Sequence, residues 1–305
     1  DIVPNHMAIT VPGNRWWYDV LRNGRASRYA DHFDIDWDPP QSKLSGRILI
    51  PVLPDHYGEV LERGDLRLVR HHDEIVVTFA DLLFPLEPRT VGALVAQVAP
   101  ADADIDDELR GLIEHLVSLP DELADRGAIA QRQRDEPVLV ERLAARWRTD
   151  DGLASRLDDL LDEINADPDR LDRVLDAQHY RLARWQTSGQ ELDYRRFFDV
   201  DDLVGLRTER TAVFDEIHER VLGWVRDRTI AGIRIDHVDG LRDPMGYLCE
   251  LRARAPGTWI LVEKILEPNE ELRPEWPVDG TTGYELGSLL TQLYVDPAAA
   301  TPLAA

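Results

Sequence analysis

Two carboxylates that follow short apolar runs are the side chains best suited to chemistry in this sequence. Asp236 follows the apolar run 230–235 and lies two residues after Arg234, and Glu263 follows the run 259–262. Two facing carboxylates suit cleavage of a glycosidic bond, in which one attacks the anomeric carbon and the other protonates the departing oxygen. The spacing therefore indicates glycoside chemistry.

The neighbours of the two carboxylates predict how each ionises. Arg234 and Asp236 share one face of an extended strand, so the guanidinium should keep Asp236 charged. Burial at the end of an apolar strand should raise the pKa of Glu263 and favour the acid role. Lys264 should point away from Glu263, because successive side chains on a strand alternate.

A third candidate strand end carries Asn5 and His6, which we expect on the same rim. Each residue alone has a simpler interpretation: a strand-end carboxylate is more often a helix cap or turn residue, and a histidine more often a hydrogen-bonded core residue. Oxygen ligands could also hold calcium or magnesium. No acidic cluster with ligand spacing occurs, so we predict no metal and no cofactor.

The elements around these residues alternate between helix and strand, which predicts parallel β/α units. In such proteins the chemistry lies at the carboxyl ends of the strands. The expected helices and strands of this part are 208–228, 230–235, 245–254, 259–263, a helical stretch near 268–273, and 285–294.

The first 190 residues have a different pattern. Asn14 should cap a helix over 15–23. Three strands (47–53, 66–70 and 74–79) and a short helix (57–63) should follow, and about four or five amphipathic helices over 101–180, with Pro120, Pro137 and Pro168 at helix starts or breaks. The loop 186–207, rich in aromatic and arginine residues, should line a site or fill its own core.

Composition limits the partners and the compartment. The net charge of −23 argues against nucleic acid and anionic membranes as partners. The single cysteine, Cys249, should be a small buried side chain, and it fits a reducing cytoplasm. No apolar run approaches the ~20 residues that span a bilayer. The start at Asp1 and the absence of an evident end lead us to expect an internal piece of a longer protein.

Several segments together resemble one enzyme family. Residues 1–6, 232–236 and 261–263 resemble three signature regions of the α-amylase-type glycoside hydrolase superfamily (family 13). With the segments 194–199, 205–207, 234–244, 262–266 and 280–284, the chain resembles the maltooligosyl trehalose synthase family almost throughout. The resemblance implies an α/β fold: a partial (β/α)8 TIM barrel, about strands 3 to 6, with a large, mainly helical insertion between strands 3 and 4. Residues 1–40 and 191–305 would be barrel segments and 41–190 the insertion.

The resemblance also implies an activity: rearrangement of the reducing-end α-1,4 link of a maltooligosaccharide to an α,α-1,1 link. Asp236 would form the glycosyl-enzyme and Glu263 would act as acid and base. The implied substrate contacts are Asn5, His6, Arg234, His237, Lys264, Tyr194, Arg195 and Arg196. The family further implies pairing in function with a maltooligosyl trehalose trehalohydrolase.

The sequence departs from the superfamily at its third catalytic carboxylate, an aspartate preceded by histidine. No such element follows Tyr284, so we expect this chain to be inactive alone, with an open barrel edge that favours aggregation. Two alternatives stay open: an α-1,4-glucan or trehalose-releasing hydrolase, and a non-catalytic carbohydrate-binding barrel.

Overall fold

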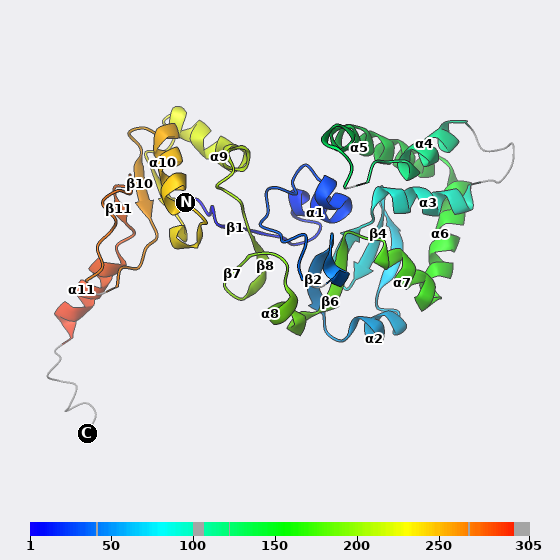
Figure 1. Ribbon diagram of the computed structural model, residues 1–305, viewed down its shortest axis with the longest axis horizontal. Coiled ribbons are helices and arrows are strands. Elements are labelled where there is room, and N and C mark those ends of the chain that lie inside the picture. The colour runs from blue at the N-terminus through cyan, green and yellow to red at the C-terminus, as the bar shows by residue number, and fades with distance from the viewer. Residues whose placement is uncertain (41, 100–106, 122, 268, 296–305) are drawn as a thin grey trace, which may run out of the picture. The chain divides into compact units, whose positions relative to one another are not determined.

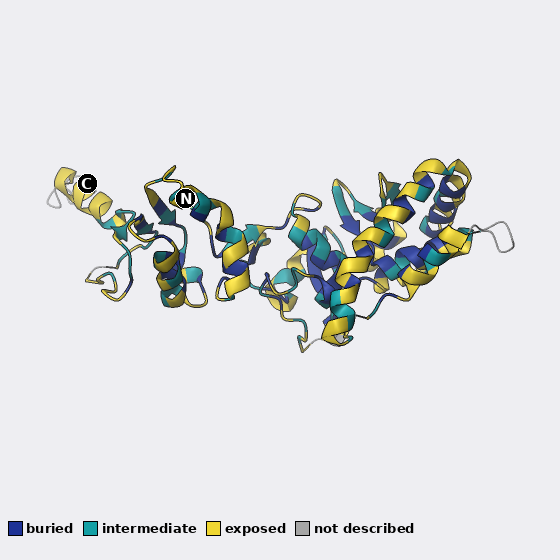
Figure 2. Cartoon of the chain, turned by 90° about the horizontal axis from the view of Figure 1, so that it is seen from above, coloured by how far each residue is buried: buried dark blue, intermediate teal, exposed yellow. Residues whose placement is uncertain are grey.

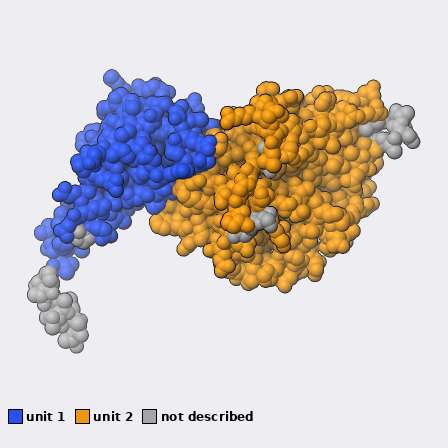
Figure 3. Space-filling model, in the orientation of Figure 1, with its two compact units in different colours: residues 1–7, 205–305 blue, residues 8–204 orange. Residues whose placement is uncertain are grey.

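The structure is a computed structural model that describes residues 1–40, 42–99, 107–121, 123–267 and 269–295 (Figure 1). Its mixed α/β content divides into two compact units (Figure 3). Unit 1 contains Asp1–Met7 and Gly205–Ala305, and unit 2 contains Ala8–Val204. The sequence predicted boundaries near residues 40 and 190 between the barrel segments and the insertion. The two compact units neither confirm nor contradict those boundaries.

Unit 1 is built on parallel strands. Strands β9 (Gly232–Ile235), β10 (Trp259–Val262) and β11 (Gly280–Thr281) are hydrogen-bonded neighbours in that order, and all pairs are parallel. Ile2 forms an isolated parallel bridge to Ile235, on the side of β9 that does not pair with β10. The described strands do not close into a barrel.

Helices connect these strands, as parallel pairing requires. Helix α9 (Thr211–Arg226) precedes β9, α10 (Pro244–Arg254) joins β9 to β10, and α11 (Tyr284–Tyr294) follows β11. The strands pack into one apolar core with α9 and α10, and Ile235, Ile260 and Val262 are fully buried in it. One face of these strands is buried in this core, whereas the other face is half-buried or exposed, and Trp259 is 66% exposed.

Unit 2 contains most of the described helices, two small sheets and most of a third. Strands β2 (Ile48–Leu53) and β6 (Tyr180–Arg184) form a parallel pair, and β3 (Arg67–His71), β4 (Glu74–Phe79) and β5 (Leu82–Pro85) an antiparallel sheet. Strand β7 (Arg196–Phe197) pairs with β8 (Val200–Gly205), and the chain crosses between the units in β1 (His6–Ala8) and β8.

The helices of unit 2, except the four-residue helix Ser188–Glu191, bury apolar residues on one face, and their other faces are exposed (Figure 2). They are α1 (Arg15–Asn23), α2 (Tyr57–Glu62), α3 (Pro88–Val98), α4 (Asp107–Val117), α5 (Arg126–Thr149), α6 (Asp151–Asn165), α7 (Pro168–Asp176) and α8 (Ser188–Glu191). No described helix has the length and apolarity needed to cross a membrane.

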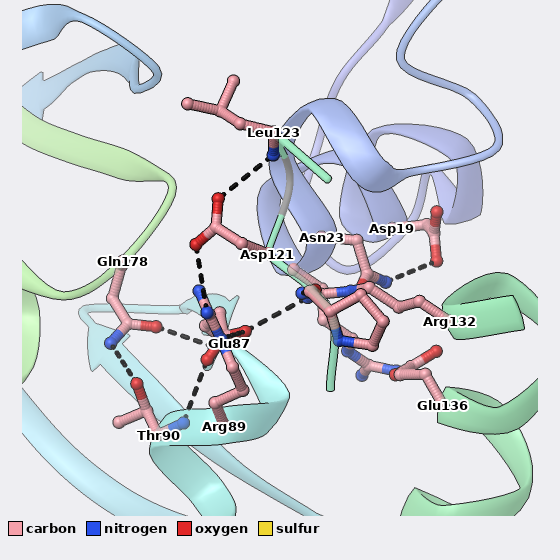
Figure 4. A network of polar contacts seen from close by, with 12 residues as sticks. Asp19, Asn23, Glu87, Arg89, Thr90, Asp121, Leu123, Arg132, Glu136 and Gln178 are labelled. Carbon is pink, nitrogen blue, oxygen red and sulfur yellow. Dashed lines mark hydrogen bonds and ion pairs between the residues drawn. The ribbon is translucent and has the colours of Figure 1, made fainter. Parts of the chain in front are cut away.

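A buried ionic network ties α1, α3 and α5 together (Figure 4). The Arg132 side chain, 1% exposed, donates to Asn23 Oδ1 at 3.0 Å and to the Pro120 carbonyl at 2.8 Å, and pairs with Glu87 Oε1 at 3.1 Å. Glu87 also caps α3 by accepting from the Thr90 N–H at 3.0 Å. Removing one partner of such a buried pair typically costs about 3–5 kcal/mol, because a charge is left uncompensated.

Most predicted elements are present, and four predictions about local structure are wrong. The segment 186–207, expected as a loop, contains α8, β7 and β8. The described residues 269–273 are not helical. Pro137 lies inside α5 and ends no helix, because α5 packs along α4 and α6 and tolerates one lost hydrogen bond. Cys249 is exposed, since it falls on the outer side of α10, away from Tyr247, Leu248 and Leu251.

Candidate active site

The two predicted catalytic carboxylates lie at the carboxyl ends of adjacent parallel strands. Asp236 directly follows β9 and Glu263 directly follows β10. Their backbones are fixed by the sheet: the Asp236 N–H donates to the Ile2 carbonyl and the Glu263 N–H to the Ile235 carbonyl, each at 2.8 Å. The parallel register therefore brings two carboxylates that are 27 residues apart in the sequence to one edge.

One guanidinium joins both carboxylates. Arg234 Nη1 lies 3.1 Å from Asp236 Oδ1, and its Nη2 lies 3.5 Å from Glu263 Oε1. The same Nη1 lies 2.7 and 2.8 Å from the two oxygens of Asp1. The Asp236 and Glu263 side chains are 23% and 25% exposed, so a ligand can reach both.

Glu263 is also held by hydrogen-bond donors. The backbone N–H of His237, whose φ of 48° is left-handed, donates to Glu263 Oε2 at 2.9 Å. The Tyr284 hydroxyl lies 3.2 Å from Oε1. The His237 N–H is the largest cause of a lowered pKa for Glu263, and Asp236, Tyr284 and Arg234 lower it further, while burial opposes them.

The predicted direction of the Glu263 pKa is therefore wrong for this structure. The prediction assumed that burial after an apolar strand would dominate. Glu263 lies one residue beyond the buried strand, where donors and a cation reach it, and stabilisation of the charged form outweighs desolvation.

Asn5 and His237 meet over a glycine. A Cβ at Gly240 would lie 2.2 Å from His237 Cδ2 and 3.1 Å from Asn5 Cγ, so both side chains pack against the bare backbone there. Asn5 is 1% exposed, and its Nδ2 lies 3.4 Å from Nδ1 of the partly buried His6. The sequence predicted Asn5, His6 and His237 as part of the site, but it did not predict that Asn5 and His237 would pack against Gly240.

Lys264 turns away from Glu263, as the strand alternation predicts. Its Nζ lies 3.0 Å from Asp239 and 2.9 Å from Glu270, and hydrogen bonds to these carboxylates raise the pKa of Lys264. The structure therefore shows Lys264 tying together the loops after β9 and β10.

The other three predicted contacts belong to unit 2. The Tyr194 hydroxyl donates to the Asp201 carbonyl at 3.0 Å, Arg195 pairs with Asp34 at 2.9 Å, and Arg196 pairs with Asp199 at 2.8 Å and with Asp201. Tyr194 also lines a pocket of about 530 Å³ together with Trp17 and Phe84.

Two neighbours of the carboxylates were not predicted as site residues. Asp1 and Tyr284 both lie in segments that carry the family resemblance, and their membership of those segments was the only available signal. In the described part of the chain, no group of three or more histidine, cysteine, aspartate or glutamate side chains is arranged to hold a metal ion.

Comparison with known proteins finds similar sequences. The chain is 34% identical over its whole length to Mycobacterium tuberculosis proteins named "Putative maltooligosyl trehalose synthase", in strains CDC 1551 and H37Rv, and spans 28% of their length. No protein-family model matches the chain.

Solved structures give the same result. The maltooligosyltrehalose synthase of Arthrobacter ramosus is 31% identical with a TM-score of 0.65, over 99% of this chain and 29% of that one. The "DSM5389 glycosyltrehalose synthase" is 27% identical with a TM-score of 0.65, over 99% of this chain and 31% of that one. The resemblance inferred from the sequence is thus confirmed: this chain is similar, from end to end, to a segment of the maltooligosyl trehalose synthases.

Proposed function

We propose that the chain carries the nucleophile and the acid/base of an intramolecular glucosyl transfer in trehalose biosynthesis. The reaction converts the reducing-end α-1,4 link of a maltooligosaccharide to an α,α-1,1 link with retention. The observation that carries this proposal is the single Arg234 guanidinium that contacts both Asp236 and Glu263 at neighbouring strand ends. The named relatives supply the substrate class.

The reaction takes two displacements. Asp236 attacks C1 of the penultimate glucose while Glu263 gives its proton to O4 of the terminal glucose. The freed glucose turns in place and presents its anomeric hydroxyl. Glu263 then removes the proton of that hydroxyl, whose oxygen attacks C1 and releases Asp236. Every bond broken is replaced by one formed, and no glucose leaves the protein.

Substrate contacts follow from the same arrangement. Arg234 Nη1 lies 3.1 Å from Asp236 Oδ1, and Asn5, His6 and His237 lie in unit 1 with the two carboxylates, where they can hold sugar hydroxyls. We retain Lys264, Tyr194, Arg195 and Arg196 as further contacts. The Tyr194 pocket, with aromatic walls and the carboxylates of Asp199, Asp201 and Asp202, is suited to a sugar ring.

The parallel order of Ile2, β9, β10 and β11 supports a fold assignment as well. We propose that they are strands 3 to 6 of a (β/α)8 barrel, with residues 41–190 as the insertion between strands 3 and 4. We further propose that the protein is cytoplasmic and that it supplies substrate to a maltooligosyl trehalose trehalohydrolase.

The lowered pKa of Glu263 bears on activity. A general acid must hold its proton near neutral pH, which needs a drier environment than these residues alone provide. We propose that the 305 residues alone do not turn over substrate, and that they do so when the rest of a barrel encloses Glu263 and supplies a third carboxylate.

The test is a chimera in which these 305 residues replace the segment that they match in the Arthrobacter ramosus synthase. With maltopentaose, reducing power should fall while chain length stays constant. Asp236→Asn should lower the rate by at least about a thousandfold, because the nucleophile is lost. Asp227→Asn, which changes an exposed aspartate beyond α9, should leave the rate unchanged.

Other outcomes separate the alternatives. Shorter reducing sugars would indicate a hydrolase, and glucan binding without turnover in a folded chimera would indicate a non-catalytic barrel. Full activity of the 305 residues alone would refute the role given to the enclosing barrel, but not the roles of Asp236 and Glu263.

A further inference from the structure

The turn between β7 and β8 carries an exposed aromatic ring in an unusual backbone conformation (Figure 1). Phe197 pairs with Val200, so Phe198 and Asp199 form a two-residue turn. The φ of Phe198 is 49°, in the left-handed region that glycine and asparagine favour and that a bulky residue rarely adopts. Phe198 is nevertheless 71% exposed. Burial in a core therefore does not explain why a phenylalanine occupies this position.

Contacts within the hairpin hold this turn in place. Arg196 Nη2 lies 2.8 Å from Asp199 Oδ1, and Arg196 Nη1 pairs with Asp201 in β8. The Phe197 ring packs edge-to-face with the Phe198 ring, with 4.5 Å between ring centres and 75° between planes. Backbone strain that is held by surrounding contacts is typical of functional sites. These contacts orient Phe198 while most of its surface stays open to a ligand.

The residues directly after Phe198 line the Tyr194 pocket. Residues 199–202 form one wall of this pocket, whose volume of about 530 Å³ is usual for small-ligand sites. Trp17 and Phe84 supply aromatic surface, and residues 50–52 of β2 supply apolar surface. All of these residues belong to unit 2. Phe198 therefore stands beside the wall of a pocket that is largely apolar inside and acidic along one side.

The charges of this wall select among ligands. Three aspartates lie in it, and Arg196 pairs with two of them, so negative charge exceeds positive charge and anions are disfavoured. Asp202 is exposed, and because exposed ion pairs contribute little, a cation gains little there. A neutral sugar fits both features of the site. Its hydroxyls donate to carboxylates, and the apolar C–H face of its ring packs on an aromatic ring.

We propose that Phe198 is the stacking residue of a glucan-binding site at this pocket. One glucose unit of an α-1,4-glucan packs on the Phe198 ring, and its hydroxyls donate to Asp199 and Asp202. The choice of glucan rests on the proposed function, whereas the role of Phe198 rests on the turn and the pocket. Glycine or asparagine would relieve the strain of the turn but would offer the sugar no ring.

Calorimetric titration with maltoheptaose, together with thermal unfolding, tests this role. Phe198→Asn should weaken maltoheptaose binding by about tenfold or more, because an aromatic contact is lost. The same variant should keep or raise the thermal midpoint, because asparagine tolerates the left-handed backbone. Phe198→Trp retains a ring and should keep the affinity within about threefold. A Phe198 with only a structural role would instead give a lower midpoint and an unchanged affinity in Phe198→Asn.

His72 offers a matched control. It is an exposed ring residue with a φ of 52° in the two-residue turn between β3 and β4, and it does not line this pocket. His72→Asn should therefore change the affinity for maltoheptaose by less than about twofold. Equal losses in the Phe198 and His72 variants would overturn the proposal, as would displacement of maltoheptaose by spermidine, which would identify a cation site.

The chimera described above separates this proposal from the proposed reaction. If binding depends on Phe198 but the chimera does not turn over maltopentaose, the reaction is refuted and the glucan site stands. If the chimera is active but maltoheptaose binds equally to the parent protein and to Phe198→Asn, the glucan site is refuted and the reaction stands.

Discussion

At the scale of residues, a small number of hydrogen-bond donors holds the two carboxylates of the candidate active site. Arg234 serves Asp236, Glu263 and Asp1 at once, and the His237 backbone N–H is the main stabiliser of ionised Glu263. His237 has a left-handed backbone conformation, and its ring packs on Gly240. A small change at Gly240 should therefore be measurable at Glu263.

Gly240→Ala should disturb the site through His237. The new Cβ would lie 2.2 Å from the His237 ring, so the ring and its backbone must shift, at a cost of about 1–3 kcal/mol in stability. Loss of the N–H donor should raise the pKa of Glu263 towards its ordinary value. Carbon-13 NMR of the glutamate carboxyl groups measures the pKa, and thermal unfolding measures the cost.

Gly111→Ala is the control for that substitution, because no atom lies within 4 Å of a Cβ built there. It should leave the pKa of Glu263 unchanged and stabilise α4 slightly. An unchanged Glu263 in the Gly240 variant would show that His237 does not depend on the glycine.

At the scale of elements, the sequence predicted those whose signals are local. The Asn14 cap accepts from the N–H groups of Trp16 and Trp17, as expected, and β9 and β10 match their apolar runs. Strand β6 was missed, because its only strand partner in the described part of the chain is β2, more than a hundred residues earlier. Alternating buried Tyr180 and Leu182 in five residues is a weak signal after a run of helices.

The part of the candidate site that depends on local sequence patterns could also be predicted. The register of adjacent parallel strands brings Asp236 and Glu263 together, and both strands were visible as patterns. The Glu263 pKa was not predictable, because its main cause is the backbone direction at His237. Tyr284 could not be derived from spacing, since its contact with Glu263 depends on the irregular chain between β10 and β11.

Helices α9 and α10 share a buried contact that should make stability depend on pH. His218 is fully buried, with its ring nitrogens 2.8 Å from the Phe214 carbonyl and 2.7 Å from the Tyr247 hydroxyl. Burial lowers the pKa of His218 below its ordinary 6.5. The unfolded chain therefore takes up a proton first as pH falls, and stability present above about pH 6.5 is lost below it.

His218→Gln should flatten that dependence. Between about pH 7.5 and pH 5.5, the thermal midpoint of the parent protein should fall more steeply than that of the variant. His56→Gln, at an exposed position before α2, should retain the parent's slope. Equal slopes for the parent and the His218 variant would show that His218 is not the titrating group; the absolute stability of either variant does not enter the comparison.

At the scale of the whole molecule, the feature that most needs a partner is α11. Its leucines at 286, 289, 290 and 293 recur at helical spacing, yet all are between 47% and 79% exposed, and no residue of the helix is buried (Figure 2). Strand β11, directly before it, pairs only with β10 among the described strands. An apolar helix face beside an open sheet edge is a site of association.

The protein should therefore self-associate as its concentration rises, through α11. Light scattering after size-exclusion chromatography should show a molar mass that increases with loading. Leu289→Lys with Leu293→Lys should keep the protein monomeric, because two charges on the apolar face oppose its burial. Ser288→Lys with Gln292→Lys adds the same charges elsewhere on α11 and should still associate. If both double variants become monomeric, net charge and not the leucine face controls association; if neither does, the contact lies outside α11.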